Sequence, residues 1–540
     1  MKINNVSIFF MWIPVILSAF THMLNPVGYP CVQVDEGIYM RRAMHVLAGL
    51  GPQDPASRFD HGQASTSSYD HPYFGQLFLA GVFAIIGYPS SITPSSSGNP
   101  LHLIEMLYMV PRILMGILAV VDTFLIYKIS ERRYNRNVAL IASVIFAVMP
   151  LSWLLRRILL DTILMPFLLS SIFFALGKKR ATDSDNNKNK NNNKNIVLIL
   201  LSGIFLGMAI FTKIPAFTMI PLVGFLIYTK NKGSLKMLGL WLIPVISIPM
   251  IWPAYAIITN HFDEWLNGVL WQATGRQGIG IKSILSIFKM DPTLVALGIT
   301  GVIYVAIIRK DLLLVFWLIP FLVFASLIGW VVYFHWMLVL PAFCIAGAIM
   351  IEDLSDKFSK RKKISKSLLK SSVTSAIGIF GLISTILLIT NNFSLSLFEA
   401  AAYVVKNVQD NTIQSGGSKI SKGINHNNDM TIVSGPIYSW IFKYIFNMAH
   451  ILSHPRDSSQ PITNRVLLMV DSTYRYIISN AIAKTEVEDK KQIGTLGMLY
   501  NNSKPRAFFV DNGVQYNNLM YPYTGIKDCP LSGIEIRTNY

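Results

Sequence analysis

The sequence predicts an α-helical polytopic membrane protein with about eleven transmembrane helices, followed by a C-terminal extracytoplasmic α/β domain. Hydrophobic residues make up 52% of the 540 residues, charged residues make up 14%, and the mean hydropathy is +0.45. Because a soluble domain usually carries roughly 25% charged residues, the composition excludes a purely soluble, disordered or coiled-coil protein. Long apolar runs occur only before Asn391. We therefore expect residues 1–390 to form the transmembrane domain and residues 391–540 to form the outer domain.

The predicted spans are apolar runs that approach the roughly 20 residues needed to cross a bilayer core about 30 Å thick. Each must be helical, because lipid offers no partner for backbone N–H and C=O groups. They cover roughly 6–24, 105–127, 138–154, 160–177, 196–212, 214–229, 237–258, 292–308, 311–329, 333–351 and 371–390.

Lysine and arginine are concentrated in alternate connections between these runs, and the positive-inside rule places such connections in the cytoplasm. We expect a multi-pass protein of the cell membrane with a cytoplasmic N-terminus. The loop 25–104 and the C-terminal domain would then lie outside. The net charge of +18 sits largely in lipid-facing loops, which favours membrane lipid over nucleic acid as its partner. The basic connections contain Arg132, Arg133 and Arg136; Lys178, Lys179, Arg180, Lys188, Lys190 and Lys194; Lys230, Lys232 and Lys236; Arg309 and Lys310; and the run Lys357–Lys370.

The last 150 residues alternate short apolar runs with helical patterns, which is typical of a small α/β domain. Three cysteines are too few for a disulfide scaffold. Cys31 and Cys529 fall on the same predicted side, which permits a bridge without requiring one. The expected strands are Thr431–Ser434, Val466–Asp471 and Ala507–Asp511, and the expected helices are Leu395–Val408, Ile437–Met448 and Thr473–Ala483.

The outer loop 25–104 is far longer than the other connections, and loops of this length are usually functional. It places Asp35 and Glu36 just beyond the first span, and it later contains the sequence from Asp70 to Gln76. The apolar run 74–88 is too short to cross the membrane, so we expect a re-entrant or interfacial helix there.

Asp35 and Glu36 have three interpretations on spacing alone. They could stabilise the N-terminus of a helix. They could bind a hard cation through carboxylate oxygens. Alternatively, one of them could act as a general base that accepts the proton of an attacking hydroxyl.

Several cations fall within or between the spans at the outer leaflet: Arg112, Arg156, Arg157 and Lys213. Such charges are costly in hydrocarbon and mark a site or a paired partner. A cluster of cations at this depth suggests an anion, and a lipid phosphate is the anion available there. The alternative for each residue is that it snorkels to the interface.

The order of these elements resembles the protein O-mannosyltransferases, integral-membrane enzymes of the GT-C superfamily that use polyprenyl-phosphate-linked sugars. Tyr73 and Gln76 replace a proline and a lysine of that family's pattern. The C-terminal segment looks more like that of bacterial or archaeal relatives, which include the lipid A aminoarabinose transferases. The matching elements are Asp35-Glu36, the sequence Asp70–Gln76, Arg112, the sequence Arg156–Asp161, the stretch Ser202–Lys213, and Tyr333–Trp336 with Leu340-Pro341.

The resemblance implies an inverting glycosyltransferase that moves a hexose, most often mannose, from a lipid phosphate to a hydroxyl acceptor on the outer face. The acceptor would be a protein, a lipid or a glycan. The residues found above suit this reaction, because the attacking hydroxyl must lose a proton to a base and the departing phosphate needs fixed cations. No metal is required, although a divalent cation is compatible with the reaction. The roles we expect are Asp35 as base; Glu36 as the residue orienting the base or the sugar; His71 as positioning group or proton shuttle; Arg112, Arg156, Lys213 and Arg276 at the phosphate; and Asp161 in substrate binding.

Two other functions compete with this one. A transporter or lipid-linked-sugar flippase would show paired repeats with broken helices and charges at the membrane midplane. Neither is evident in the sequence, and the acidic outer loop would be unexplained. An oligosaccharyltransferase-type enzyme would need a second acidic metal motif, and the loop 25–104 contains none.

Overall fold

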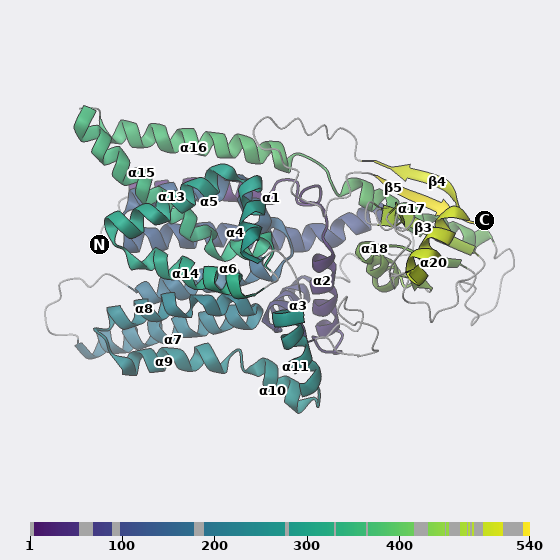
Figure 1. Ribbon diagram of the computed structural model, residues 1–540, viewed down its shortest axis with the longest axis horizontal. Helices are drawn as coiled ribbons and strands as arrows, with labels where there is room; N and C mark the ends of the chain where they lie inside the picture. Colours follow the sequence, from purple (N-terminus) through teal and green to yellow (C-terminus); the bar gives the residue numbers. More distant parts are fainter. Residues whose placement is uncertain are drawn as a thin grey trace.

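The computed structural model describes residues 5–52, 69–88, 98–177, 188–275, 280–328, 331–362, 365–414, 430–448, 450–452, 465–471, 474–475, 478–479, 490–510 and 533–540. Helices that run roughly along the long axis form a bundle, and a small sheet lies beyond one end of it (Figure 1). The helix α1 (Asn5–Met23) begins at the end of the bundle remote from that sheet.

Each predicted span coincides with a helical segment. Among the described residues, six helices are long and apolar enough to cross a membrane, or seven if the bent pair α5 and η1 is one span. The number of crossings therefore remains a prediction. The segments are α1; α4 (Pro100–Arg133); α5 (Arg136–Val148), bent by 69° into η1 (Pro150–Arg156); α6 (Leu160–Leu176); α7 (Lys188–Thr212); η3 (Ile214–Met219) with α8 (Ile220–Lys230); α9 (Leu235–Ser247) with α10 (Ile251–Ile258); α13 (Pro292–Tyr304) with η6 (Val305–Arg309); α14 (Leu312–Leu327); η7 (Tyr333–Val339) with α15 (Leu340–Lys362); and α16 (Lys366–Ile389).

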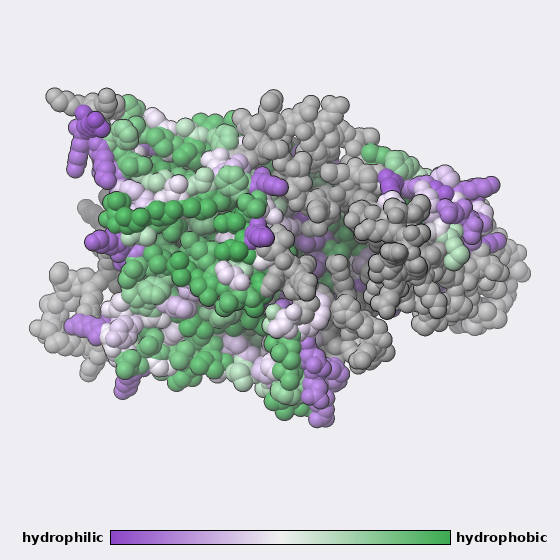
Figure 2. Space-filling view, in the orientation of Figure 1, coloured by the Kyte–Doolittle hydropathy of each residue, from purple (hydrophilic) through white to green (hydrophobic). Residues whose placement is uncertain are grey.

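The outer surface of the bundle is apolar. Figure 2 shows hydrophobic side chains covering its flank, while hydrophilic residues gather at its ends. Ile243 of α9, Ile308 of η6 and Leu327 of α14 are among the exposed aliphatic side chains. A soluble protein rarely exposes so large a continuous apolar surface, so the bundle is a membrane domain.

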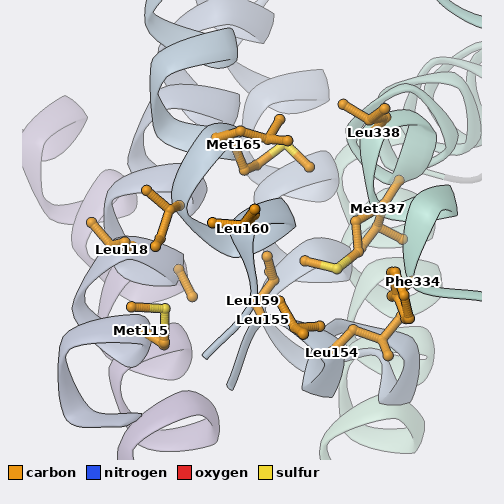
Figure 3. Close-up of a cluster of buried hydrophobic side chains, with 14 of the residues drawn as sticks. Met115, Leu118, Leu154, Leu155, Leu159, Leu160, Met165, Phe334, Met337 and Leu338 are labelled. Carbon is orange, nitrogen blue, oxygen red and sulfur yellow. The ribbon is translucent and has the colours of Figure 1, made fainter. Parts of the chain in front are cut away.

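The interior of the bundle is built around a helix break at residues 157–159, between η1 and α6. Pro150 begins the 3-10 helix η1, and residues 157–159 are extended before α6 resumes. Side chains from η1, α6, α4 and η7 pack together at this break (Figure 3). Irregular backbone at membrane depth is tolerated only where it is enclosed by protein. The break thus brings Arg156 and Arg157 inside the bundle rather than against lipid.

Several helices lie outside the bundle axis at the end nearest the sheet. The helix α2 (Val34–Leu47) runs across that end, between the bundle and the C-terminal part (Figure 1). The helix α3 (Phe74–Ile86) has 13 residues and is too short to cross, as predicted. The segment before α13 forms α11 (Phe262–Leu270), η4 (Trp271–Gly275), η5 (Gly280–Ser283) and α12 (Ile284–Met290).

The C-terminal part, residues 391–540, contains a five-stranded sheet in the order β2-β1-β3-β5-β4 in its described residues. The strands β2, β1 and β3 are parallel, and β5 pairs antiparallel with β3 and β4. This confirms the predicted mixture of helices and strands. The elements are α17 (Leu395–Gln414), β1 (Met430–Val433), α18 (Pro436–Trp440), η9 (Ile441–Ile445), β2 (Ile451–Leu452), β3 (Arg465–Val470), α20 (Lys490–Asn501), β4 (Lys504–Phe509) and β5 (Ile534–Thr538).

The structure adds two strands to those expected in the C-terminal part, and it leaves one expected helix untested. The strands β2 and β5 were not predicted, because β2 has two residues and β5 alternates apolar with charged residues. Most of the helix expected at 473–483 lies outside the described residues. Cys31 is disulfide-bonded and Cys344 is free, while Cys529, the partner that the sequence permits, lies outside the described residues.

The contact between α13 and α15 depends on glycine. A Cβ on Gly301 would lie 2.6 Å from the carbonyl carbon of Ala346. Gly301→Ala should therefore lower the stability of the purified protein by about 1–3 kcal/mol, as overpacking does, and lower the thermal unfolding midpoint in detergent. Gly239→Ala in α9 is the control, because its Cβ would meet nothing within 4 Å. Equal midpoints for the two variants would contradict this account of the packing.

Candidate active site

The first turn of α2 carries the two predicted acids. Gln33 occupies the N-cap position, so Asp35 and Glu36 are inside the helix rather than capping it through their side chains. Negative charge in the first turn is favourable, because the N-terminus of a helix carries partial positive charge. Asp35 is half-buried and Glu36 is fully buried. The two neighbours therefore face different surroundings.

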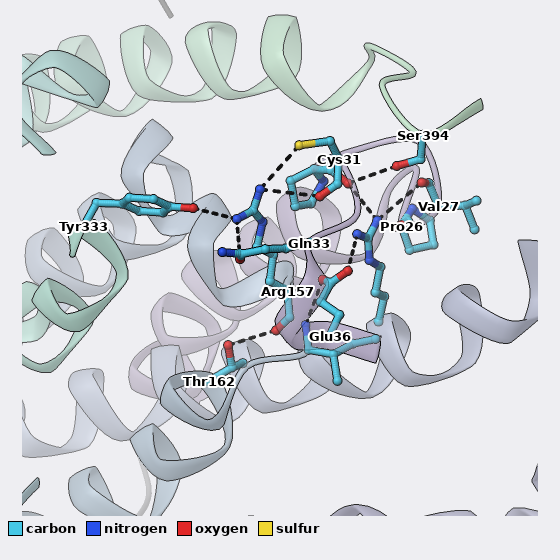
Figure 4. A network of polar contacts seen from close by, with 12 residues as sticks. Pro26, Val27, Cys31, Gln33, Glu36, Arg157, Thr162, Tyr333 and Ser394 are labelled. Atoms are coloured by element: carbon cyan, nitrogen blue, oxygen red, sulfur yellow. Dashed lines mark hydrogen bonds and ion pairs between the residues drawn. The ribbon is translucent and has the colours of Figure 1, made fainter. Parts of the chain in front are cut away.

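Glu36 joins α2 to two other segments (Figure 4). Its Oε2 is 2.7 Å from Nη2 of Arg112 on α4, and both side chains are completely buried. Its Oε1 accepts a hydrogen bond of 3.1 Å from the backbone N–H of Ile158 in the helix break. Arg112 also donates to the carbonyl oxygens of Pro26 and Pro30, at 3.0 and 2.8 Å. This network connects α2, α4, the segment before α2, and the break.

A second face of α2 presents Asp35, Tyr39 and Arg42, which lie four and three residues apart and therefore share one side. Nη2 of Arg42 is 2.7 Å from Oδ1 of Asp70. His71 places its Nε2 4.0 Å from Oδ2 of the same carboxylate, and its ring centroid is 6.2 Å from that of Tyr39.

The pKa of the Tyr39 phenol shows which acids share this space. Burial raises the pKa of Tyr39, and the charges of Asp35, Asp161 and Asp70 raise it further, whereas Arg42 lowers it. The charges of three carboxylates, from α2, α6 and the segment before α3, thus act on the pKa of one tyrosine. These acids lie far apart in the sequence, and only the fold brings them together.

Asp161 and Lys213 form a buried ion pair. Nζ of Lys213 is 2.5 Å from Oδ2 of Asp161, and it also lies 4.7 Å from the ring centroid of Phe334 in η7. The other oxygen of Asp161, Oδ1, is buried and has no hydrogen-bond partner in the described part of the chain. The pair therefore neutralises its own charges and leaves one carboxylate oxygen unused.

Arg156 and Arg157 follow each other at the break but have different partners. Arg156 donates through Nη2 to the carbonyl oxygens of Leu24 and Asn25. Its Nε and Nη1 are buried without a hydrogen-bond partner among the described residues. Arg157 donates to the side chains of Gln33 and Tyr333, each at 2.7 Å (Figure 4).

The structure thus groups seven of the eight predicted site residues at one end of the bundle, and Arg276 lies outside the described residues. The sequence did not reveal the pair Arg42–Asp70 or the central place of Tyr39. The seven-residue spacing from Asp35 to Arg42 was the available signal, since it places both on one helix face. Among the described residues, no group of three or more His, Cys, Asp or Glu side chains could hold a metal ion.

The arrangement supports acid–base chemistry beside an anion. Asp35 is half-buried, whereas Arg156 is buried inside the bundle and keeps its positive charge without a carboxylate partner among the described ion pairs. Buried cations act strongly on an anion because little water screens them. The arrangement favours the general-base interpretation of Asp35. For Glu36 it favours a structural ion pair, because both carboxylate oxygens already accept hydrogen bonds.

Comparison with known proteins bears on the family and the fold. Residues 40–261 match the family model described as dolichyl-phosphate-mannose-protein mannosyltransferase. The matched region contains every described candidate residue except Asp35 and Glu36, which precede it. No curated protein matches the chain in sequence.

Two solved structures share the fold. One is the archaeal oligosaccharyltransferase AglB from Archaeoglobus fulgidus in complex with an inhibitory peptide and a dolichol-phosphate, with a TM-score of 0.53 and 12% identity, covering 88% of this chain and 71% of that one. The other is ArnT from Cupriavidus metallidurans bound to undecaprenyl phosphate, with a TM-score of 0.51 and 11% identity. The match covers 100% of this chain and 99% of that one. These findings confirm the predicted likeness to the mannosyltransferase family and the GT-C membrane fold.

The Glu36–Arg112 pair should behave as one unit. Removing one partner leaves the other charge buried and unpaired, so Glu36→Gln or Arg112→Met should each destabilise the protein by about 3–5 kcal/mol. The double variant should lose less than the sum, by at least about 1 kcal/mol. Denaturation of the four proteins in detergent measures this coupling. Losses that simply add would show that the two side chains do not depend on each other.

Proposed function

We propose that this chain, which has the GT-C membrane fold, is an inverting glycosyltransferase. It would move a hexose, mannose by the family match, from a polyprenyl-phosphate donor to a hydroxyl of a protein, lipid or glycan. The observation that carries the proposal is that a half-buried carboxylate, Asp35, and buried cations occur together at one end of a membrane bundle. The family match and the lipid phosphates bound in the two similar structures support the same donor chemistry.

In the proposed reaction the acceptor oxygen attacks the anomeric carbon of the donor sugar. The bond from that carbon to the phosphate oxygen breaks, and the phosphate leaves with the electron pair. The proton of the acceptor hydroxyl passes to Asp35, which acts as general base. The leaving phosphate needs no proton, so the reaction requires neither a second acid nor a metal. Attack opposite the leaving group inverts the configuration.

The phosphate would be bound mainly by Arg156, because Lys213 is already paired with Asp161. Arg156 has two buried nitrogen atoms without hydrogen-bond partners in the described structure. Such unsatisfied donors are costly unless a ligand meets them. Arg112 is already committed to Glu36 and to backbone carbonyl groups, so we assign it to holding the site. His71, beside Asp70 and Tyr39, would position the acceptor or the sugar.

The donor and the acceptor would meet on the outer side of the cell membrane. The uneven distribution of basic residues supports this orientation, with the N-terminus in the cytoplasm and the C-terminal part outside. The lipid tail would remain in the bilayer while its phosphate reaches the buried cations.

Replacing the proposed base tests the chemistry. Asp35→Asn should lower sugar transfer from a labelled polyprenyl-phosphate donor by about a hundredfold or more, because it removes the proton acceptor. Expression and the unfolding midpoint should be unchanged, since Asp35 is half-buried. Asp263→Asn, an exposed acid of α11, is the matched control and should retain full activity. Normal turnover in the Asp35 variant would remove Asp35 from the base role.

Replacing Arg156 tests the phosphate site. Arg156→Met should weaken binding of polyprenyl phosphate by about tenfold to a hundredfold, because hydrogen bonds to charged groups contribute about 1.5–3 kcal/mol. Binding can be measured by titration of the purified protein in detergent. Arg136→Met is the control, since that side chain is 63% exposed at the start of α5. Equal affinity in both variants would assign Arg156 to structure alone.

A further inference from the structure

The C-terminal part contacts a face of α2 that does not carry Asp35. Gly37, Arg41 and His45 lie four residues apart and form one face of α2. This face meets Trp440 and Tyr444, which lie at the junction of α18 and η9. Figure 1 shows α18 on the side of α2 that is turned toward the sheet.

Trp440 fits against a glycine that leaves room for it. A Cβ on Gly37 would lie 2.5 Å from Nε1 of Trp440 and 2.9 Å from its Cε2. Real side chains do not approach so closely, so the indole occupies the place where a side chain would be. Trp440 is only 2% exposed. The contact is therefore enclosed, and neither partner can move without displacing the other.

The same indole also contacts α4. Its ring lies 6.2 Å from that of Tyr108, edge to face, and Tyr108 packs on Phe398 of α17 at 5.4 Å. One turn further along α4, Arg112 lies 5.8 Å from the ring of Tyr108 and pairs with Glu36. Trp440 thus wedges between α2 and α4 directly beside the ion pair that joins these helices.

Tyr444 extends the contact along α2. The guanidinium of Arg41 lies 5.7 Å from its ring centroid, and the ring of His45 lies 5.9 Å away in an edge-to-face arrangement. Cation–π and aromatic contacts of this kind contribute modestly but have preferred geometries. The contact thus spans two turns of α2, from Gly37 to His45.

From these contacts we infer that the C-terminal part positions Asp35. Trp440 and Tyr444 hold one face of α2, and because the helix is rigid they also fix the face that carries Asp35, Tyr39 and Arg42. Both are positioning residues, since neither touches the proposed reacting atoms. The inference that this contact keeps Asp35 in position as the base rests on the proposed function. The inference that it fixes the position of α2 does not.

The test combines Gly37→Ala with Trp440→Ala in the full-length protein. Gly37→Ala alone forces the indole or α2 to move, and displacements of about 1 Å can lower rates a hundredfold. We expect at least a tenfold fall in kcat with the KM for the donor changed less than threefold, because the buried cations stay in place. In the Trp440→Ala background the same substitution should cost less than twofold, because the obstacle is gone. Trp440→Phe should keep most of the activity of the wild-type protein.

Hydrogen–deuterium exchange of residues 34–47 provides a readout that needs no sugar transfer. Trp440→Ala should speed exchange in α2 while leaving α13 and α15 unchanged. Trp12→Ala, which removes a half-exposed indole from α1, should leave α2 unchanged and serves as the matched control. Unaltered exchange in α2, or an equal cost of Gly37→Ala in both backgrounds, would overturn the inference. Faster exchange in a protein that transfers no sugar would instead reject the proposed function and keep the positioning role.

Discussion

A buried carboxylate in a membrane protein must keep its cation, and the position of α2 depends on this constraint. Glu36 and Arg112 are both withdrawn from solvent and 2.7 Å apart. Separating them would leave two unpaired charges in a medium of low polarity, which costs several kcal/mol. The first turn of α2 is therefore held against α4 and against the helix break at Ile158. Asp35 is the neighbouring residue in the same turn, so the Glu36–Arg112 pair also fixes the position of Asp35.

Once its first turn is held, α2 connects three parts of the molecule. One face meets Asp70, in the segment before α3, through Arg42. A second meets α4, and a third meets the C-terminal part through Trp440 and Tyr444. The start of the C-terminal part is also tied to this region, since the N–H of Phe393 donates to the carbonyl of Gly28 and Asn25 donates to Asn391. The helix that carries the proposed base is thus held both by the bundle and by the C-terminal part.

The sequence predicted the helical bundle well, because apolar length and basic connections are properties of single segments. It also indicated Asp35, Arg156, Asp161 and Lys213 as candidates from their unusual positions. It could not reveal that Glu36 pairs with Arg112, that Lys213 pairs with Asp161, or that Arg42 pairs with Asp70, because the partners lie on different elements. These pairings decide which charges remain for a substrate. They leave Arg156 as the main candidate for binding the phosphate. They also depend on a helix break that the periodicity of hydrophobic residues does not reveal.

The account requires that the end of the bundle carrying α2 faces the outside of the cell. A single cysteine in place of Leu50, just beyond α2 and 69% exposed, reports this directly when intact cells are treated with a membrane-impermeant maleimide. A cysteine in place of Lys236 at the opposite end of the bundle is the comparison. We expect the residue 50 reporter to react in intact cells and the residue 236 reporter only after permeabilisation. The reverse pattern would place the carboxylate of Asp35 on the cytoplasmic side and contradict the central claim.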